Sequence, residues 1–289
     1  MPDLTALASL SSALTIAVAQ AAPSLVSVHS HRARATGFVW KSGLVISADE
    51  ALADEGPNIV LSADGTEKSA TIVGRDHTTD VALLRVDGLA ARPANLTTDV
   101  PALGALAVIV GADHGTPISA LAMISKSAGS WRSLRGGEID ARVELDTRLR
   151  RSLEGGLVLD ATGTAIGMAV SGPRRTLVIP TATIQRVAGA LETHGRIARG
   201  YLGVGLQPVK LDDGLGAMVM SVDKAGPAAA AGLLQGDIIT AFNDEPVSGM
   251  RTLLRKLGPA SVGTVIKLAG SRGGKDIQVS VTVGERPAS

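Results

Sequence analysis

Short runs of valine, isoleucine and leucine constrain the fold of this chain more than any other feature. After Pro23 these runs are broken every few residues by glycine, serine or charged side chains, and the chain holds 34 glycines and 13 prolines. Short apolar runs bounded by turn residues are typical of β-strands. The sequence therefore predicts a mainly β protein with many short strands, and it disfavours a helical bundle.

The strands are expected in three sets separated by other elements. The first covers residues 25–28, 38–40, 44–46, 59–61, 70–73 and 81–86, the second 106–110, 118–124, 141–145, 157–159, 165–170 and 177–179, and the third 202–206, 217–222, 238–242, 265–268 and 277–283. Asp64-Gly65 predicts a hairpin turn. Helical spacing over 183–194 with Gly195 as a C-terminal stop predicts a connecting helix, and shorter helices are expected near 228–231 and 250–257.

Composition excludes several functions. The 28 basic and 27 acidic side chains leave a net charge of +1, so we expect no nucleic-acid partner. The absence of cysteine excludes disulfides, thiol catalysis and zinc held by thiolates. No cofactor is expected.

The uncharged stretch from Leu4 to Ala22 requires a separate interpretation. A membrane span needs about 20 predominantly apolar residues, whereas serine, threonine and glutamine dilute this segment. We therefore expect no stable membrane span. The segment also lacks the basic start of a secretory signal, because Asp3 offsets the terminal amine. A helix packed on the body of the protein and a cytoplasmic location are expected, with the periplasm as the alternative.

Four motifs, in their order along the chain, resemble those of the HtrA (Deg) family of trypsin-like serine proteases. They are A-T-G-F at 35–38, T-D-V-A-L-L at 79–84, V-I-P-T at 178–181 and R-G-Y-L-G-V at 199–204. The resemblance implies a chymotrypsin-like double β-barrel followed by a PDZ domain, which is a small β-sandwich or partly open barrel with two helices. It implies an N-terminal helical segment (1–22), two barrels within 23–182 (about 23–98 and 99–182), a linker helix (183–198) and the PDZ domain (199–287).

The same resemblance locates the catalytic triad. The family's aspartate falls on Asp80, but the position of its histidine holds Glu50 and that of its serine holds Glu154. The backbone donors of the oxyanion hole would belong to Ser152 and Glu154. Because a hydroxyl must attack the substrate while a base takes its proton, we expect no intact catalytic site.

Other residues near the triad positions are considered as a substitute nucleophile or a substitute base. Ser152 carries a hydroxyl near the nucleophile position, but a displacement of several ångströms defeats catalysis. His114 is a candidate to approach the cleft, whereas His77 is expected to be a solvated turn residue.

Glu50, Asp80 and Glu154 would converge in such a site. Two carboxylates about 4 Å apart repel by roughly 4 kcal/mol at an effective dielectric constant near 20, so one should be protonated, turn to solvent or meet a cation. The cations expected nearby are Arg148, Arg150, Arg151, Arg174 and Arg175. A calcium or magnesium ion held by the three carboxylates is the less favoured alternative.

The predicted PDZ domain shows no replacement of functional residues comparable to that of the catalytic histidine and serine. The resemblance assigns Tyr201, Leu202, Gly203 and Val204 to the loop that binds a peptide carboxylate. Met250 and Leu254 lie on an apolar helical stripe and are expected to line the peptide groove.

The sequence therefore predicts a catalytically inactive HtrA homologue with an adaptor or regulatory role in protein quality control. Its expected partners are proteins or peptides with exposed C-termini and an active HtrA-like protease, and a homo-oligomer is left open. The alternatives are an active serine endopeptidase with a non-standard site and a cation-binding regulatory module.

Overall fold

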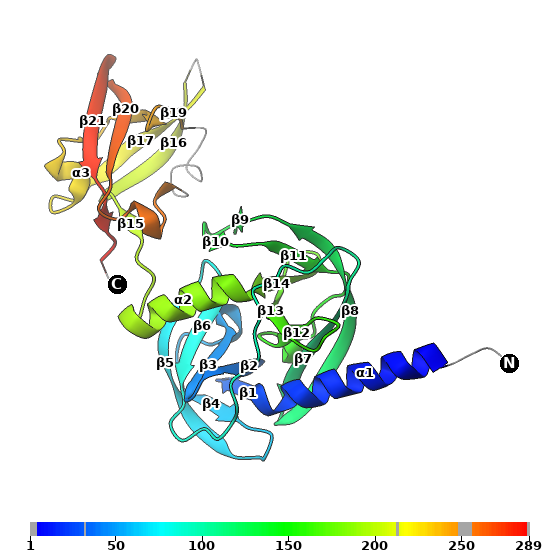
Figure 1. The fold of residues 1–289 in the computed structure, drawn as a ribbon. Coiled ribbons are helices and arrows are strands. Elements are labelled where there is room, and N and C mark those ends of the chain that lie inside the picture. Colours follow the sequence, from blue (N-terminus) through cyan, green and yellow to red (C-terminus); the bar gives the residue numbers. More distant parts are fainter. Residues whose placement is uncertain (1–4, 32, 212–213, 248–255, 288–289) are drawn as a thin grey trace. The chain divides into compact units, whose positions relative to one another are not determined.

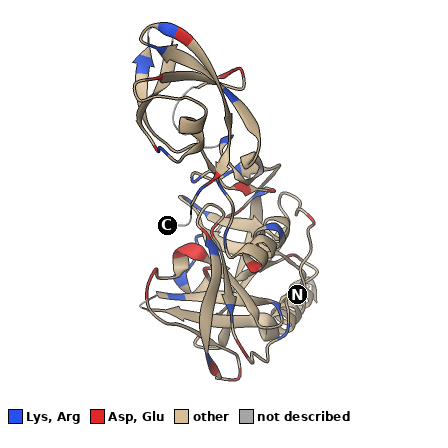
Figure 2. Ribbon diagram, turned by 90° about the vertical axis from the view of Figure 1, so that its left-hand side faces the viewer, with Lys and Arg blue, Asp and Glu red and all other residues tan. Residues whose placement is uncertain are grey.

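The computed structural model describes residues 5–31, 33–211, 214–247 and 256–287. The chain divides into two compact units after residue 197, and each is described by itself (Figure 1). Two closed barrels and a separate β-rich unit confirm the expected fold class. Acidic and basic segments are interspersed along the ribbons of both units in Figure 2.

The first barrel is built from the first set of predicted strands. In spatial order β1-β2-β3-β6-β5-β4, its strands are β1 (Leu25–Ser30), β2 (Ala33–Lys41), β3 (Leu44–Ala48), β4 (Asn58–Leu61), β5 (Glu67–Asp76) and β6 (Val81–Arg85). The predicted hairpin joins β4 to β5, where Gly65 adopts a φ of 79° that favours glycine. A single 3₁₀ turn, η2 (Asp49–Ala51), follows β3.

The second barrel follows the second set in the order β11-β14-β13-β12-β7-β8. Its strands are β7 (Leu106–Asp113), β8 (Thr116–Ala128), β11 (Arg142–Leu145), β12 (Leu157–Leu159), β13 (Ala165–Ser171) and β14 (Thr176–Pro180). A two-stranded hairpin of β9 (Trp131–Arg132) and β10 (Glu138–Ile139) lies between β8 and β11, and the 3₁₀ turn η3 (Arg151–Leu153) precedes β12.

One buried hydrophobic cluster joins the two barrels. Phe38 and Leu83 reach it from the first barrel, Val110 and Met168 from the second, and Leu191 from helix α2 (Thr181–His194). Figure 1 shows α2 lying across β5 and β6. The helix ends as predicted, because Gly195 takes a left-handed conformation (φ 70°) and donates its N–H to the carbonyl of Leu191 at 2.8 Å.

Helix α1 (Thr5–Ala21), which the 3₁₀ turn η1 (Ala22–Ser24) follows, packs on the second barrel only near its C-terminal end. Ala17 and Ala21 are its buried residues, whereas Leu7 and Ile16 are 64% and 56% exposed. The segment Thr5–Ser24 has a mean hydropathy of 1.4 and is long and apolar enough to cross a membrane by length and composition. The expectation that its polar residues are too many for a span is wrong on this criterion, which signal sequences also meet.

The second unit holds the third set of strands. Its main sheet has the order β16-β17-β18-β20-β21, with β19 paired to β18, and a separate pair joins β15 to β22. The elements are β15 (Gly200–Tyr201), β16 (Val204–Leu211), β17 (Gly214–Val222), α3 (Pro227–Ala230), β18 (Ile238–Phe242), β19 (Glu245–Pro246), η4 (Pro259–Ser261), β20 (Val265–Arg272), β21 (Lys275–Thr282) and β22 (Gly284–Glu285). The buried side chains of this unit form a core of their own.

Candidate functional site

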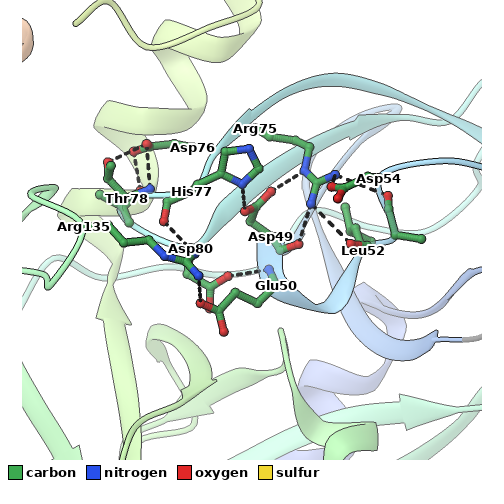
Figure 3. Close-up of polar contacts among 12 residues, drawn as sticks. Asp49, Glu50, Leu52, Asp54, Arg75, Asp76, His77, Thr78, Asp80 and Arg135 are labelled. Atoms are coloured by element: carbon green, nitrogen blue, oxygen red, sulfur yellow. Dashed lines mark hydrogen bonds and ion pairs between the residues drawn. The ribbon is translucent and has the colours of Figure 1, made fainter. Parts of the chain in front are cut away.

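Glu50 and Asp80 meet at one end of the first barrel. Glu50 lies on η2, directly after β3, and Asp80 lies in the turn before β6. The backbone N–H of Glu50 donates to Oδ1 of Asp80 at 2.7 Å (Figure 3). Asp80 has a φ of 59°, a conformation rare for residues other than glycine and best tolerated by asparagine and aspartate. The structure therefore brings together two of the three residues predicted at the triad positions.

Arg75 on β5 holds the turn that carries Glu50. Its guanidinium forms an ion pair with the carboxylate of Asp49, whose side chain is 1% exposed. The same guanidinium donates to the carbonyls of Asp49 at 3.0 Å and Leu52 at 3.3 Å, and it reaches Asp54 at 3.0 Å (Figure 3). A buried charge of this kind is costly unless it is paired and hydrogen-bonded, so the position of η2 depends on Arg75.

The histidines do not complete a triad. His77 is 55% exposed, as expected of a turn residue, but its Nδ1 also lies 2.5 Å from Oδ2 of Asp49. His114 does not lie beside the carboxylates, because its Nε2 contacts Arg34 and its ring packs edge-on against His29. Neither imidazole hydrogen-bonds to a hydroxyl group among the described residues.

A cation from the second barrel neutralises Glu50. Nη2 of Arg135, in the turn of the β9–β10 hairpin, lies 2.9 Å from Oε1 of Glu50, and Nη1 donates to the carbonyl of His77 at 3.2 Å. Ser133 on the same hairpin donates its hydroxyl to the carbonyl of Thr78 at 2.6 Å. The hairpin thus covers the Glu50 side of the site (Figure 3).

We expect Arg135→Ala to loosen this hairpin without unfolding the protein. The side chains of Arg135 and Glu50 are each 53% exposed, and exposed ion pairs contribute about 1 kcal/mol or less. Amide hydrogen exchange should accelerate over residues 133–137 and 76–80, while the thermal midpoint barely changes. Arg132→Ala, on the same hairpin but paired with Glu138, is the control. Unchanged exchange in Arg135→Ala would show that the ion pair does not hold the hairpin.

Glu154 is buried at the other side of the site. It is 8% exposed and its carboxylate accepts two hydrogen bonds from Ser171, one from the backbone N–H at 2.6 Å and one from the hydroxyl at 2.5 Å. Its own N–H, expected as an oxyanion donor, donates to the carbonyl of Arg151 at 3.1 Å. The carboxylate oxygens and the backbone N–H of Glu154 therefore already have hydrogen-bond partners within the protein.

Ser152 is partly buried in η3, and its carbonyl accepts the hydroxyl of Thr36 at 2.7 Å. Among the described residues, no histidine or carboxylate accepts a hydrogen bond from the Ser152 hydroxyl. The structure therefore provides no base that would activate this serine.

The carboxylates affect one another's protonation. Burial, together with the charges of Glu50, Glu154 and Asp49, raises the pKa of Asp80 to about 7, while the hydrogen bond from the N–H of Glu50 opposes the rise. Burial also raises the pKa of Glu154, against the hydrogen bonds from Ser171. Protonation of Asp80 near neutral pH thus relieves the repulsion expected from the sequence.

The cations expected from the sequence form no ion pair with the cluster, although the charge of Arg151 opposes the rise in the pKa of Glu154. Arg148, Arg150, Arg151, Arg174 and Arg175 are all exposed. Within the described part of the chain none of the five forms an ion pair with Glu50, Asp80 or Glu154. Glu50 pairs with Arg135 instead, and Glu154 accepts hydrogen bonds from Ser171. The described residues also contain no group of three or more histidine, aspartate or glutamate side chains placed to hold a metal ion.

In the second unit, the predicted peptide-binding loop precedes the edge strand β16. Gly203 has a φ of 76° and its carbonyl accepts the N–H of Asp223 at 2.7 Å. Leu202 is buried, and Tyr201 donates its hydroxyl to Asp223 at 2.9 Å. The N–H groups of Leu202 and Gly203 donate to none of the described residues. Val204 is partly buried at the start of β16, and Met250 and Leu254 lie outside the described residues.

Comparison with known proteins agrees with this architecture. Residues 35–168 match trypsin-like peptidase domains, and residues 200–283 match PDZ domains. A probable periplasmic serine endoprotease DegP-like of Rhizobium meliloti is 28% identical over 275 residues, which are 89% of this chain and 54% of the relative. The chain spans about half the length of the curated relatives it matches.

Two solved structures are similar over nearly the whole chain. The serine endoprotease from Yersinia pestis has a TM-score of 0.72 and 25% identity, and the similarity covers 94% of this chain and 98% of that one. The HtrA-type protease AlgW with a decapeptide has a TM-score of 0.72 and 23% identity, with the same coverage.

The two barrels and these matches define a trypsin-like peptidase fold followed by a PDZ domain. Both domains, in this order, are similar to those of HtrA-type serine proteases.

Proposed function

We propose that this chain binds polypeptide segments and C-termini without cleaving them, as an adaptor or regulatory homologue of HtrA proteases in protein quality control. Hydrolysis by a trypsin-like fold needs a hydroxyl nucleophile beside a base. Glu154 is the observation that carries the proposal. It occupies the position assigned to the serine, has no hydroxyl, and is bound through both oxygens of its carboxylate to Ser171.

The position assigned to the histidine supports the same conclusion. The carboxylate of Glu50 is paired with Arg135 and so is already engaged with a cation instead of a nucleophilic hydroxyl. Asp80, whose carboxylate accepts the backbone N–H of Glu50, has no hydroxyl group that could act as a nucleophile. We therefore assign the triad positions to Glu50, Asp80 and Glu154, and none of them supplies the attack on a peptide bond.

The PDZ loop supports peptide binding. The N–H groups of Leu202 and Gly203 donate to none of the described residues and would serve as donors to a peptide carboxylate, and β16 lies at an edge of its sheet. A bound C-terminus would thus gain charge-assisted hydrogen bonds and a neighbouring strand to pair with. The AlgW structure with a decapeptide is a related chain in complex with a peptide.

The test is peptide binding by the whole chain. Fluorescently labelled peptides with an apolar free C-terminus should bind, and the same peptides with an amidated C-terminus should bind at least tenfold more weakly, because about 1.4 kcal/mol of charge-assisted contact is lost. Gly203→Val should also weaken binding, since a β-branched residue opposes a φ of 76°. Equal affinity for free and amidated peptides would contradict the assignment of this loop.

The relatives support a proposal about location. Those matched are named as periplasmic proteases, and α1 meets the length and hydropathy of a signal sequence. Of the two compartments expected from the sequence, we therefore propose the periplasm. We propose that an active HtrA-like protease in the same compartment is a partner, because it would cleave the polypeptides that this chain binds. A homo-oligomer is compatible with this role.

A further inference from the structure

Five arginines are concentrated on two loops beside Glu154. Arg148, Arg150 and Arg151 lie between β11 and β12, and Arg174 and Arg175 lie in the turn between β13 and β14. All five are exposed. We call the surface formed by these five residues the arginine platform.

The two loops of the arginine platform are fastened together at both ends. At one end, the N–H and the hydroxyl of Thr176 donate to the carbonyl of Thr147, at 3.0 and 2.9 Å. At the other end, the carboxylate of Glu154 accepts the N–H and the hydroxyl of Ser171. All five arginines therefore lie between two pairs of cross-links, and their loops form one surface.

The two loops of the platform carry an excess of positive charge, with five arginines against the two carboxylates of Asp146 and Glu154. Several arginines elsewhere form ion pairs with carboxylates, namely Arg75, Arg135, Arg142, Arg186 and Arg272. Over the described residues, none of the five platform arginines forms an ion pair. The charge of Glu154 acts on Arg151, but the remaining positive charges on the two fastened loops repel one another and favour an anionic ligand.

The surroundings of the platform restrict what this ligand can be. Glu50, Asp80 and Glu154 lie on the neighbouring side of the site and influence one another electrostatically. A polymer charged at every unit, such as a nucleic acid, would bring further negative charges toward Glu50, the exposed member of this group. A polypeptide can instead place a few carboxylates on the arginines and neutral residues elsewhere.

We propose that the arginine platform selects acidic segments of bound polypeptides, with glutamate or aspartate side chains paired to its guanidinium groups. Guanidinium groups are suited to this role because they bind carboxylates through two parallel hydrogen bonds. The inference rests on the proposed function, since it names the class of segment that the vacated site would take. In this account Glu154 acts as a positioning residue that ties the two arginine-bearing loops together.

The test compares three amidated peptides of the same length on the whole chain: one with three glutamates among alanine and serine, one with glutamines in their place, and one with lysines. Amidation removes the contribution expected from the PDZ loop. The acidic peptide should bind about tenfold more tightly than the glutamine peptide, and raising the salt from about 50 to about 300 mM should reduce the difference. The lysine peptide should bind most weakly.

Two sets of variants assign the effect to the platform. The Arg148→Gln, Arg150→Gln, Arg151→Gln triple variant and the Arg174→Gln, Arg175→Gln double variant should each reduce the acidic preference, whereas Arg85→Gln, an exposed residue of β6, should not. Circular dichroism checks that each variant is folded, and the salt dependence of the unmodified chain gives a test that needs no variant.

Three results would overturn the inference: equal binding of the three peptides, an acidic preference that survives both sets of variants, or tighter binding of a single-stranded DNA oligonucleotide than of the acidic peptide. If apolar peptides with free C-termini still bind in that case, the proposed function stands and only the platform assignment fails. If those peptides do not bind either, the proposed function fails with it.

Discussion

Arg75→Ala is expected to lower the free energy of unfolding of the trypsin-like unit by about 3–5 kcal/mol, the usual cost of removing one member of a buried ion pair. The carboxylate of Asp49 is 1% exposed and would lose its cation. The carbonyls of Asp49 and Leu52 would lose donors as well. For a unit of this size the thermal midpoint should fall by roughly 10 °C, which calorimetry of the whole chain measures.

Two further variants test the cause of this loss. Arg186→Ala removes an ion pair whose side chains are 47% and 40% exposed, and it should cost about 1 kcal/mol or less. Adding Asp49→Asn to Arg75→Ala should restore part of the stability, because the unpaired buried charge is removed. A midpoint for Arg75→Ala within 2 °C or so of the unmodified protein would contradict the role assigned to Arg75.

Asp80→Asn is expected to stabilise the protein, and more so at pH 8 than at pH 5. Folding raises the pKa of Asp80 from 3.8 to about 7. Between these values the folded state holds a proton that the unfolded state has lost, so stability falls as the pH rises through this window and is lowest above it. Asparagine resembles the protonated acid, can accept the N–H of Glu50, and tolerates the positive φ.

The difference in stabilisation between pH 8 and pH 5 should reach about 3 kcal/mol, since one pKa unit corresponds to about 1.4 kcal/mol. Urea unfolding of both proteins at the two pH values measures it. Asp87→Asn, at an exposed position after β6, is the control. If Asp80→Asn changes stability equally at pH 5 and pH 8, or lowers it at pH 8, then Asp80 is ionised across the whole range.

The barrels and the connecting helix could be predicted because their signals are local. The apolar run at 81–86 predicted strand β6. The helical spacing before Gly195 predicted helix α2, which ends at Gly195 in a left-handed conformation. The short pairs β9–β10 and β15–β22 were missed, since strands of two residues carry no periodicity. The dilution argument against a membrane span failed because the mean hydropathy of the Thr5–Ser24 segment remains high despite its polar residues.

The environment of the site was harder to predict than its residues. The motifs located Glu50, Asp80 and Glu154, but no local pattern indicates that Arg135 would reach Glu50 from a hairpin of the other barrel. The five arginines predicted around the cleft form no ion pair with these carboxylates among the described residues, and Arg151 acts on Glu154 only through its charge. The contact of His77 with Asp49 likewise joins two turns that lie far apart in the sequence. Such pairings arise from tertiary structure, which spacing along the chain does not encode.

The central claim is that the scaffold binds polypeptide but lacks the groups that cleave it. Incubation of the purified chain with a fluorescent fluorophosphonate probe, which reacts with activated serines, tests this claim most directly when it is combined with casein digestion over the same period. We expect no labelling above a heat-denatured control and no casein fragments. Labelling and digestion that both disappear in Ser152→Ala would contradict the account, because Ser152 would then be a working nucleophile.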